Sequence, residues 1–175
     1  MKKKKTIKKP APKSKPSSNT DRELREQLVY LLKGGGAHVH FTDALDDFPA
    51  GKYGTFANAL PHTGWQLLEH SRIAQRDILE FSRNPKHVSP DFPAGYWPKT
   101  PAPPSPAAWG KSLKAFLRDR REMQKLVADG NTDLLLPIPH GSGQTILREA
   151  LLIADHNAYH LGQLVLLRRL LGAWR

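Results

Sequence analysis

The sequence predicts an all-α protein with the architecture of a four-helix bundle. Four segments of the 175-residue chain repeat apolar side chains every three or four residues, which is typical of amphipathic helices. No segment shows a convincing alternation of apolar and polar residues over the length of a strand. Residues 85–106 hold eight of the fifteen prolines, separate the second segment from the third, and indicate a long crossover. Amphipathic helices bury their apolar faces against one another, and four of them form a bundle.

The first twenty residues differ in composition from the rest of the chain. They hold eight Lys and no acidic residue, so most of the formal net charge of +11 lies there. So little apolar area cannot compensate the entropy cost of ordering the segment. We therefore expect residues 1–20 to be a disordered Lys-rich tail and residues 21–175 to form the bundle. The tail is interpreted either as a solubilising leader or as an arm that makes weak contact with a polyanion, either nucleic acid or anionic lipid.

Residue types that the chain lacks narrow the classes of function. The absence of cysteine excludes disulfides, thiolate metal ligands, iron–sulfur clusters and a cysteine nucleophile. No apolar run approaches the ~18–20 residues that cross a bilayer, and the Lys-rich start lacks the apolar core of a secretory signal. We therefore expect a soluble, cytoplasmic protein with no membrane partner, in which the eight histidines are the natural place for metal chemistry.

The first helix is expected to begin at Thr20, which has capping-box spacing with Glu23. Three consecutive glycines, Gly34–Gly36, make the helical state costly and predict a break. The helical pattern then resumes over residues 37–48, so we expect one helix with a glycine break that ends before Pro49. The apolar face of its first part consists of Leu24, Leu28, Leu31 and Leu32.

The second helix is expected to begin at the capping box of Thr63 and Gln66 and to end at Asn84, before a proline. The crossover that follows, residues 85–106, combines prolines with large apolar rings, which favours an ordered segment packed along the bundle. We expect Trp97 to be buried at least in part. The aromatic residues of the crossover are Phe92, Tyr96 and Trp97.

The third helix is expected to start at the Ser-Pro pair 105–106, with serine as the cap and proline at the first helical position. It ends at the Asp-Gly-Asn segment 129–131, and residues 132–143 form a connector. The last helix runs over about residues 144–171 and stops at Gly172.

Two histidines in the last helix, His156 and His160, are four residues apart and therefore lie on one face, about one turn or ~6 Å apart. Their neighbours on that face are apolar, so the pair points into the bundle, where two neutral imidazoles without a partner are costly. His70, in the middle of the second helix, can face the same interior. The alternative for each ring is an ordinary hydrogen bond at the edge of the core. Three imidazoles from two helices match the open three-ligand arrangement of a catalytic metal site.

Four strings of the sequence are similar to a known family: LREQLVYLLKGGGAHVHF (24–41), WQLLEHSRIAQRDILEF (65–81), SPDFPAGYWP (89–98) and GQTILREALLIADHNAYHLGQLVLL (143–167). Through them the sequence resembles the DinB/YfiT-like superfamily over nearly all of residues 22–172. This resemblance implies a four-helix bundle with a long crossover between the second and third helices. It also implies that His70, His156 and His160 hold a divalent metal ion, zinc, nickel, iron or manganese, with water completing its shell. Characterised relatives include transferases and isomerases that use a low-molecular-weight thiol such as bacillithiol or mycothiol.

The other five histidines are weaker candidates. His38 and His40 follow the glycine break, and His140 precedes the last helix. Each of these three either lines the mouth of the pocket or is solvated. His62 is too far along the chain from His70 to share its metal, and His87 lies in a polar turn, so neither is assigned a ligand role.

Two carboxylates, Glu69 and Asp155, directly precede proposed ligands. Metal-bound histidine is usually oriented by a hydrogen-bond acceptor, and either carboxylate could accept from a ligand on the facing helix. The alternative is an ordinary salt bridge with a nearby arginine; the candidates are Arg72, Arg76 and Arg148.

Three classes of function follow from these observations. The first is a metal-dependent enzyme that activates water or a small thiol for hydrolysis or transfer to an unknown small-molecule substrate. The second is a non-catalytic metal- or ligand-binding bundle with a role in stress or damage. The third is a nucleic-acid accessory protein that acts through its basic tail. No catalytic side chain is identified beyond the metal ligands, and a homodimer is left open.

Deleting residues 1–20 is expected to change the melting temperature little, because the tail carries charge and almost no apolar area. The check is thermal unfolding of the full-length and shortened chains in the same buffer. A large loss of stability would show that the tail docks on the bundle.

Overall fold

The computed structural model describes residues 18–58 and 60–174, and this part of the chain forms four α-helices and no strand. The fold is therefore all-α, as the sequence predicts. Two 3-10 helices, η1 and η2, lie in the connections. The elements are α1 (Ser18–Lys33), η1 (Ala50–Lys52), α2 (Gly64–Arg83), η2 (Ala94–Tyr96), α3 (Ala108–Ala128) and α4 (Ile146–Leu170).

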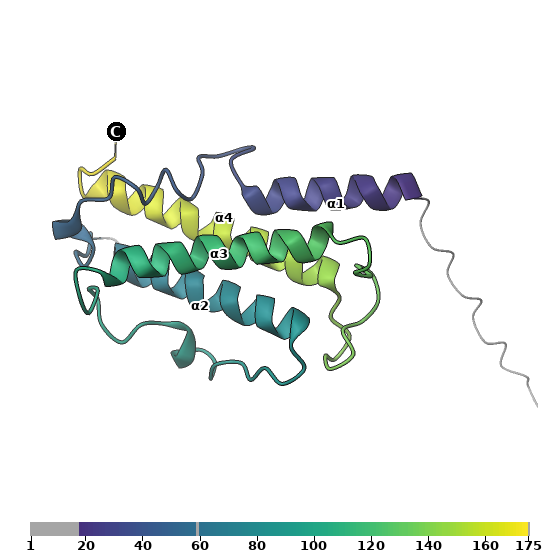
Figure 1. Cartoon of the computed structure of the whole chain (residues 1–175). Coiled ribbons are helices and arrows are strands. Elements are labelled where there is room, and N and C mark those ends of the chain that lie inside the picture. Colours follow the sequence, from purple (N-terminus) through teal and green to yellow (C-terminus); the bar gives the residue numbers. More distant parts are fainter. Residues whose placement is uncertain (1–17, 59, 175) are drawn as a thin grey trace, which may run out of the picture.

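The directions of the helices explain the long crossover. Figure 1 shows α2 and α3 running in the same direction, whereas α1 and α4 run opposite to them. Helix α2 packs against both α3 and α4, and α1 also packs against α3 and α4. Because α2 and α3 are parallel neighbours, the chain between them must return along the length of the bundle before α3 begins (Figure 1).

The first helix differs from the prediction at both ends. It begins at Ser18 rather than at Thr20, so three residues assigned to the tail are helical; the rest of the predicted tail, residues 1–17, lies outside the described residues. The helix ends at Lys33, where Gly34 adopts a φ of 75° that favours glycine.

The predicted continuation of this helix over residues 37–48 is wrong. Residues 41–47 form successive turns instead, with hydrogen bonds such as that from the Leu45 amide to the Thr42 carbonyl at 2.9 Å. The apolar residues of this segment are nevertheless part of the core, because Phe41, Leu45 and Phe48 are buried. Leu31, expected on the buried face of the helix, is 48% exposed. Burial of apolar side chains therefore does not require that the segment be helical.

The remaining helix boundaries follow local capping chemistry closely. Thr63 accepts a hydrogen bond from the Gln66 amide, and the Gln66 side chain accepts from the Thr63 amide, which confirms the capping box of α2. Helix α3 begins at Ala108 rather than at the Ser-Pro pair 105–106, which forms a turn before it. Helix α4 is capped by Thr145 and ends just before a glycine with positive φ.

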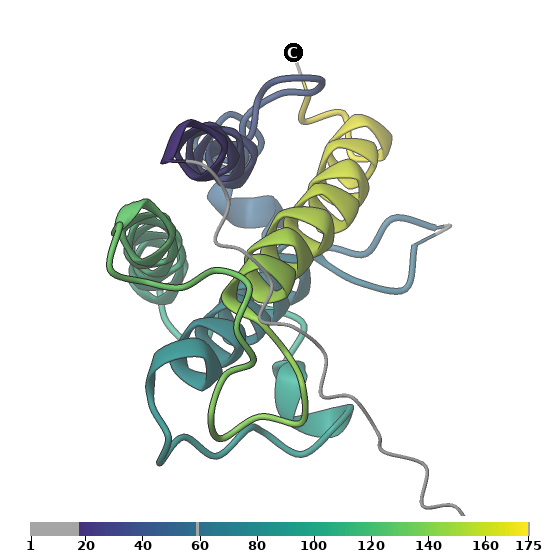
Figure 2. The same ribbon diagram turned by 90° about the vertical axis from the view of Figure 1, so that its right-hand side faces the viewer.

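Two clusters of buried apolar side chains fill the bundle, one toward each end. Figure 2, which looks along the helices, shows the four rods around this interior. The ring of Phe116 is fully buried and stacks on Phe41 at 4.3 Å between centroids. Leu79 and Met123 are fully buried in the other cluster. None of the helices in the described part of the chain is long and apolar enough to cross a membrane.

One carboxylate of α2 bonds the crossover at two points. The buried Asp77 accepts a hydrogen bond from the Tyr96 hydroxyl at 2.6 Å and another from Nε2 of His87 at 2.7 Å. Trp97 is half-buried and packs on the core, as expected, whereas Phe92 is 88% exposed and does not pack on it. The hydrogen bonds to Asp77 and the packing of Trp97 therefore hold the crossover on the bundle, whereas the ring of Phe92 contacts only Tyr96 within the crossover.

Replacing Asp77 by Ala is expected to loosen the crossover, because two half-buried donors lose their acceptor at a cost of about 0.5–1.5 kcal/mol each. Hydrogen exchange measured by mass spectrometry should then accelerate over residues 86–98 while the helices stay protected. Asp91→Ala, which removes an exposed carboxylate in the same segment, is the control. Unchanged exchange in Asp77→Ala would show that other contacts hold the crossover.

Candidate metal centre

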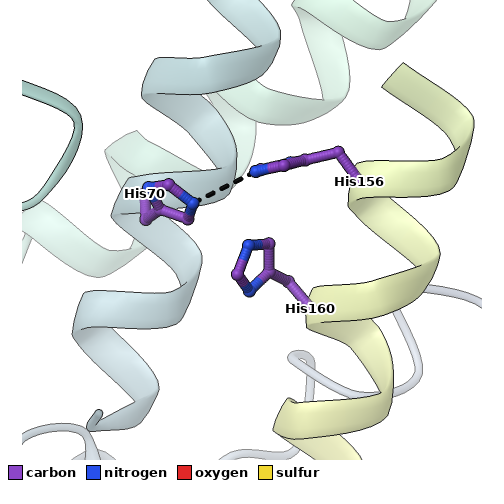
Figure 3. A group of neighbouring side chains, drawn as sticks. All are labelled: His70, His156 and His160. Carbon is purple, nitrogen blue, oxygen red and sulfur yellow. Dashed lines mark hydrogen bonds between the residues drawn. The ribbon is translucent and has the colours of Figure 1, made fainter. Parts of the chain in front are cut away.

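Two neighbouring helices bring three imidazoles to one point. His70 lies near the middle of α2, and His156 and His160 lie on successive turns of α4, directed toward α2 (Figure 3). The four-residue spacing in α4 stacks the two rings on one face, and the packing of α2 against α4 supplies the third. The structure therefore brings together the three histidines that the sequence singled out.

The nitrogens of these rings lie close enough to share one ion. One candidate ligand atom from each ring lies within 4.8 Å of the other two. The Nε2 atoms of His70 and His156 are 3.1 Å apart (Figure 3), and the ring centroids of His156 and His160 are 4.5 Å apart. His70 and His160 are buried, whereas His156 is half-buried and so keeps a path to solvent. No other group of three potential ligands lies so close in residues 18–58 and 60–174.

The crossover orients His70. Its Nδ1 lies 2.9 Å from the backbone carbonyl of Tyr96, which can only accept, so the ring proton is on Nδ1 and the lone pair of Nε2 faces the cluster. The indole of Trp97 stacks on the same ring at 3.8 Å between centroids, with 1° between the planes. The stacking contact therefore fixes the orientation of the His70 ring, and the hydrogen bond fixes its tautomer.

A glutamine fixes the tautomer of His160. Nδ1 of His160 lies 2.9 Å from Oε1 of Gln163, one turn further along α4 and half-buried. The proton is again on Nδ1, which leaves Nε2 free as a ligand. The sequence analysis missed this residue, although its position three residues after His160 could have indicated it. The Tyr96 carbonyl carried no sequence signal, because a backbone acceptor has no residue type.

The two carboxylates considered as acceptors do not contact the rings. Glu69 forms a salt bridge with Arg72 and accepts a hydrogen bond from Ser112, which bears out the alternative of an ordinary salt bridge. Asp155 is exposed on α4 and faces away from the cluster. The three imidazoles therefore have no carboxylate among their hydrogen-bond partners in the described part of the chain.

Burial keeps the cluster neutral. Loss of hydration, together with the smaller effect of neighbouring imidazoles, lowers the pKa of His70 to about 4 and that of His156 to about 3; the hydrogen bond to the Tyr96 carbonyl opposes part of the shift at His70. Burial also lowers the pKa of His160. All three rings are therefore uncharged near pH 7, which is the protonation state that a metal ligand requires.

The other histidines do not join the cluster. His62 stacks on Trp97 at 4.0 Å between centroids and so lies near the cluster without being part of it. His38 is exposed and lines a separate hollow with Phe41 and Phe116. His140 is exposed and bonds the Phe81 carbonyl at 2.6 Å. The backbone amide of His40 bonds Asp43, and the ring of His87 bonds Asp77.

The fold and the cluster define an all-α bundle with a candidate three-histidine metal centre between two of its helices. The family model of the DinB superfamily matches residues 37–164, so the chain belongs to this superfamily. The match contains all three histidines and the whole crossover. No curated protein and no solved structure matches the chain.

The depressed pKa values predict how stability depends on pH in the metal-free protein. Below the ordinary pKa of about 6.5 the unfolded chain binds protons at His70 and His156 that the folded chain does not, so stability falls as the pH falls. The loss should begin near pH 6.5 and continue toward pH 4. Urea unfolding at pH 7 and pH 5 should show a smaller loss for His156→Gln than for the original chain. An equal loss in the two proteins would contradict the inferred protonation states.

Proposed function

We propose that this protein is a metal-dependent enzyme in which His70, His156 and His160 hold one divalent ion, and that it activates water or a small thiol for hydrolysis or transfer. The observation that carries the proposal is the convergence of three neutral imidazoles, two of which already donate their Nδ1 proton elsewhere. An arrangement of this kind prepares Nε2 lone pairs for a common partner.

The donor set fits a transition metal. Two buried rings and one half-buried ring without a carboxylate are a costly cluster, and an ion that accepts their lone pairs removes the cost. Nitrogen donors suit zinc, nickel and iron, and manganese completes the set of candidates. A divalent ion held by three neutral ligands keeps its full charge, and it then lowers the pKa of a bound water or thiol and polarises an electrophile.

The residues around the cluster have separate tasks in this proposal. Tyr96 and Gln163 hold two of the rings in the ligating tautomer through hydrogen bonds at 2.9 Å. Trp97 and His62 form a stacked aromatic wall beside His70, which limits the access of water from that side. The half-buried His156 leaves a route by which a small substrate reaches the site. A cytoplasmic location, where low-molecular-weight thiols are abundant, belongs to the same proposal.

The alternative of a purely structural ion differs in one respect. A structural site has all its positions filled by the protein, whereas the described residues offer three nitrogens and no fourth ligand within the same distance. The alternative of a nucleic-acid accessory protein rests on the Lys-rich tail, most of which lies outside the described residues.

Protein purified without an affinity tag or nickel column is expected to contain about one divalent ion per chain by elemental analysis. His156→Ala removes one ligand and should lower the metal content severely, with the fold retained because the apolar faces of the helices are unchanged. His38→Ala, an exposed ring outside the cluster, is the matched control. Full occupancy in a His156→Ala/His160→Ala double variant would refute the site.

The cobalt-substituted protein then distinguishes a catalytic from a structural site. An open position predicts that azide or a small thiol changes the visible spectrum of the cobalt ion. A spectrum unaffected by both would favour the structural alternative.

A further inference from the structure

The outer side of α4 is unusually apolar for an exposed helix face. Helix α4 buries one side against the bundle, yet large apolar side chains also project from the other side. In Figure 2, α4 forms one edge of the bundle and no helix covers its outer side. The exposed apolar residues, with their exposed fractions, are Leu151 (43%), Leu152 (39%), Tyr159 (65%), Leu166 (46%) and Leu170 (53%).

These residues belong to one continuous face. Exposed positions follow one another along the helix at alternating intervals of three and four residues, which is the spacing of a helix seam that packs against a second helix. The face extends over most of α4, whose 25 residues span about 37 Å. The positions along the middle of the face are Leu152, Asp155, Tyr159, Gly162, Leu166 and Arg169, and Leu151 and Leu170 flank them at the two ends.

A glycine lies at the middle of this face. Gly162 is exposed in the interior of α4, where glycine costs up to about 1 kcal/mol relative to alanine. A Cβ atom at this position would meet no atom within 4 Å, so no contact within the described chain requires glycine. A second helix that crosses α4 at Gly162 would require it, because the missing side chain lets two backbones approach closely.

The charges on the face are placed symmetrically about the glycine. Asp155 precedes Gly162 by two turns and Arg169 follows it by two turns. Asp155 has no ion pair or side-chain hydrogen bond among the described residues. Arg169 lies over the Trp174 ring at 6.0 Å and has no ion pair there either. An acid and a base at equal distances from one point are complementary to the same face turned around by a two-fold axis.

We propose that the outer face of α4 binds a second copy of this chain, with the two α4 helices antiparallel and the two-fold axis at Gly162. In this arrangement Asp155 of each copy faces the partner's Arg169, so that the interface contains two such ion pairs. Tyr159 fills the space beside the partner's Gly162, and the leucines close the seam on both sides. His156 and His160 lie on the side of α4 that faces α2 and His70, so the dimer does not depend on the metal centre.

The pattern favours a second copy over other partners of an apolar face. A lipid surface would select basic residues around the apolar side chains, whereas an unpaired acid lies within this face. An unrelated protein partner would not require that acid and base be equidistant from a central glycine. Self-association explains three features of this face together: the apolar residues, the glycine and the positions of the charges.

Sedimentation equilibrium of the full chain tests the proposal through a charge exchange. The original protein should be a dimer at micromolar concentrations. Asp155→Arg and Arg169→Asp should each raise the dissociation constant about tenfold or more, because two attractive pairs become two repulsive ones. The double variant Asp155→Arg/Arg169→Asp restores both pairs with reversed sign and should recover the dimer.

Two further variants distinguish loss of this interface from loss of the fold and from the effect of changing an exposed apolar residue elsewhere. Gly162→Leu should dissociate the dimer, since a branched side chain separates the helices, and circular dichroism should show unchanged helix content because the position is exposed. Val88→Arg, at an apolar residue that is 85% exposed in the crossover, should leave the dimer intact. A monomeric original protein, or a double charge variant that stays as weak as the single variants, would overturn the proposal.

Discussion

The hydrogen bond from Nδ1 of His70 to the Tyr96 carbonyl links the architecture of the bundle to its candidate site. Parallel packing of α2 and α3 forces the intervening chain to return along the bundle, and this return passes beside His70. Asp77, two turns further along α2, holds the Tyr96 hydroxyl, so one residue of the crossover is fixed at both its side chain and its backbone. The orientation of a candidate ligand is therefore set by a segment without regular secondary structure.

Helix α4 combines two roles on opposite sides. Its inner side supplies His156 and His160 together with apolar residues of both core clusters. Its outer side carries the apolar face centred on Gly162. A helix with large apolar side chains on both sides is normally enclosed by protein on both, and a single copy of the chain covers only the inner side of this one. A site on one side and a self-complementary face on the other account for the composition of this helix.

The sequence predicted the candidate cluster because the spacing of its histidines does not depend on how the helices pack. Two histidines four residues apart must share a face of a helix, and apolar neighbours must turn that face inward. His70 could be added because its place in the second helix is also on an inward face. Gln163 could also have been found from its spacing to His160. The Tyr96 carbonyl that orients His70, and the absence of Glu69 from this role, depend on contacts that spacing does not encode.

The sequence by itself determined the class of fold, three of the four helices to within a few residues, and which three histidines form the candidate cluster. It could do so because caps, glycines, prolines and apolar spacing act within a few residues of one another. The tertiary structure alone decided that residues 37–48 pack as turns, since burial rewards the apolar spacing whether or not the backbone is helical. It also decided which aromatic side chain of the crossover is bound to the bundle: Tyr96 bonds Asp77, whereas Phe92 is exposed to solvent. Such choices depend on a carboxylate that lies nineteen residues away in the chain, and a local pattern carries no information about that distance.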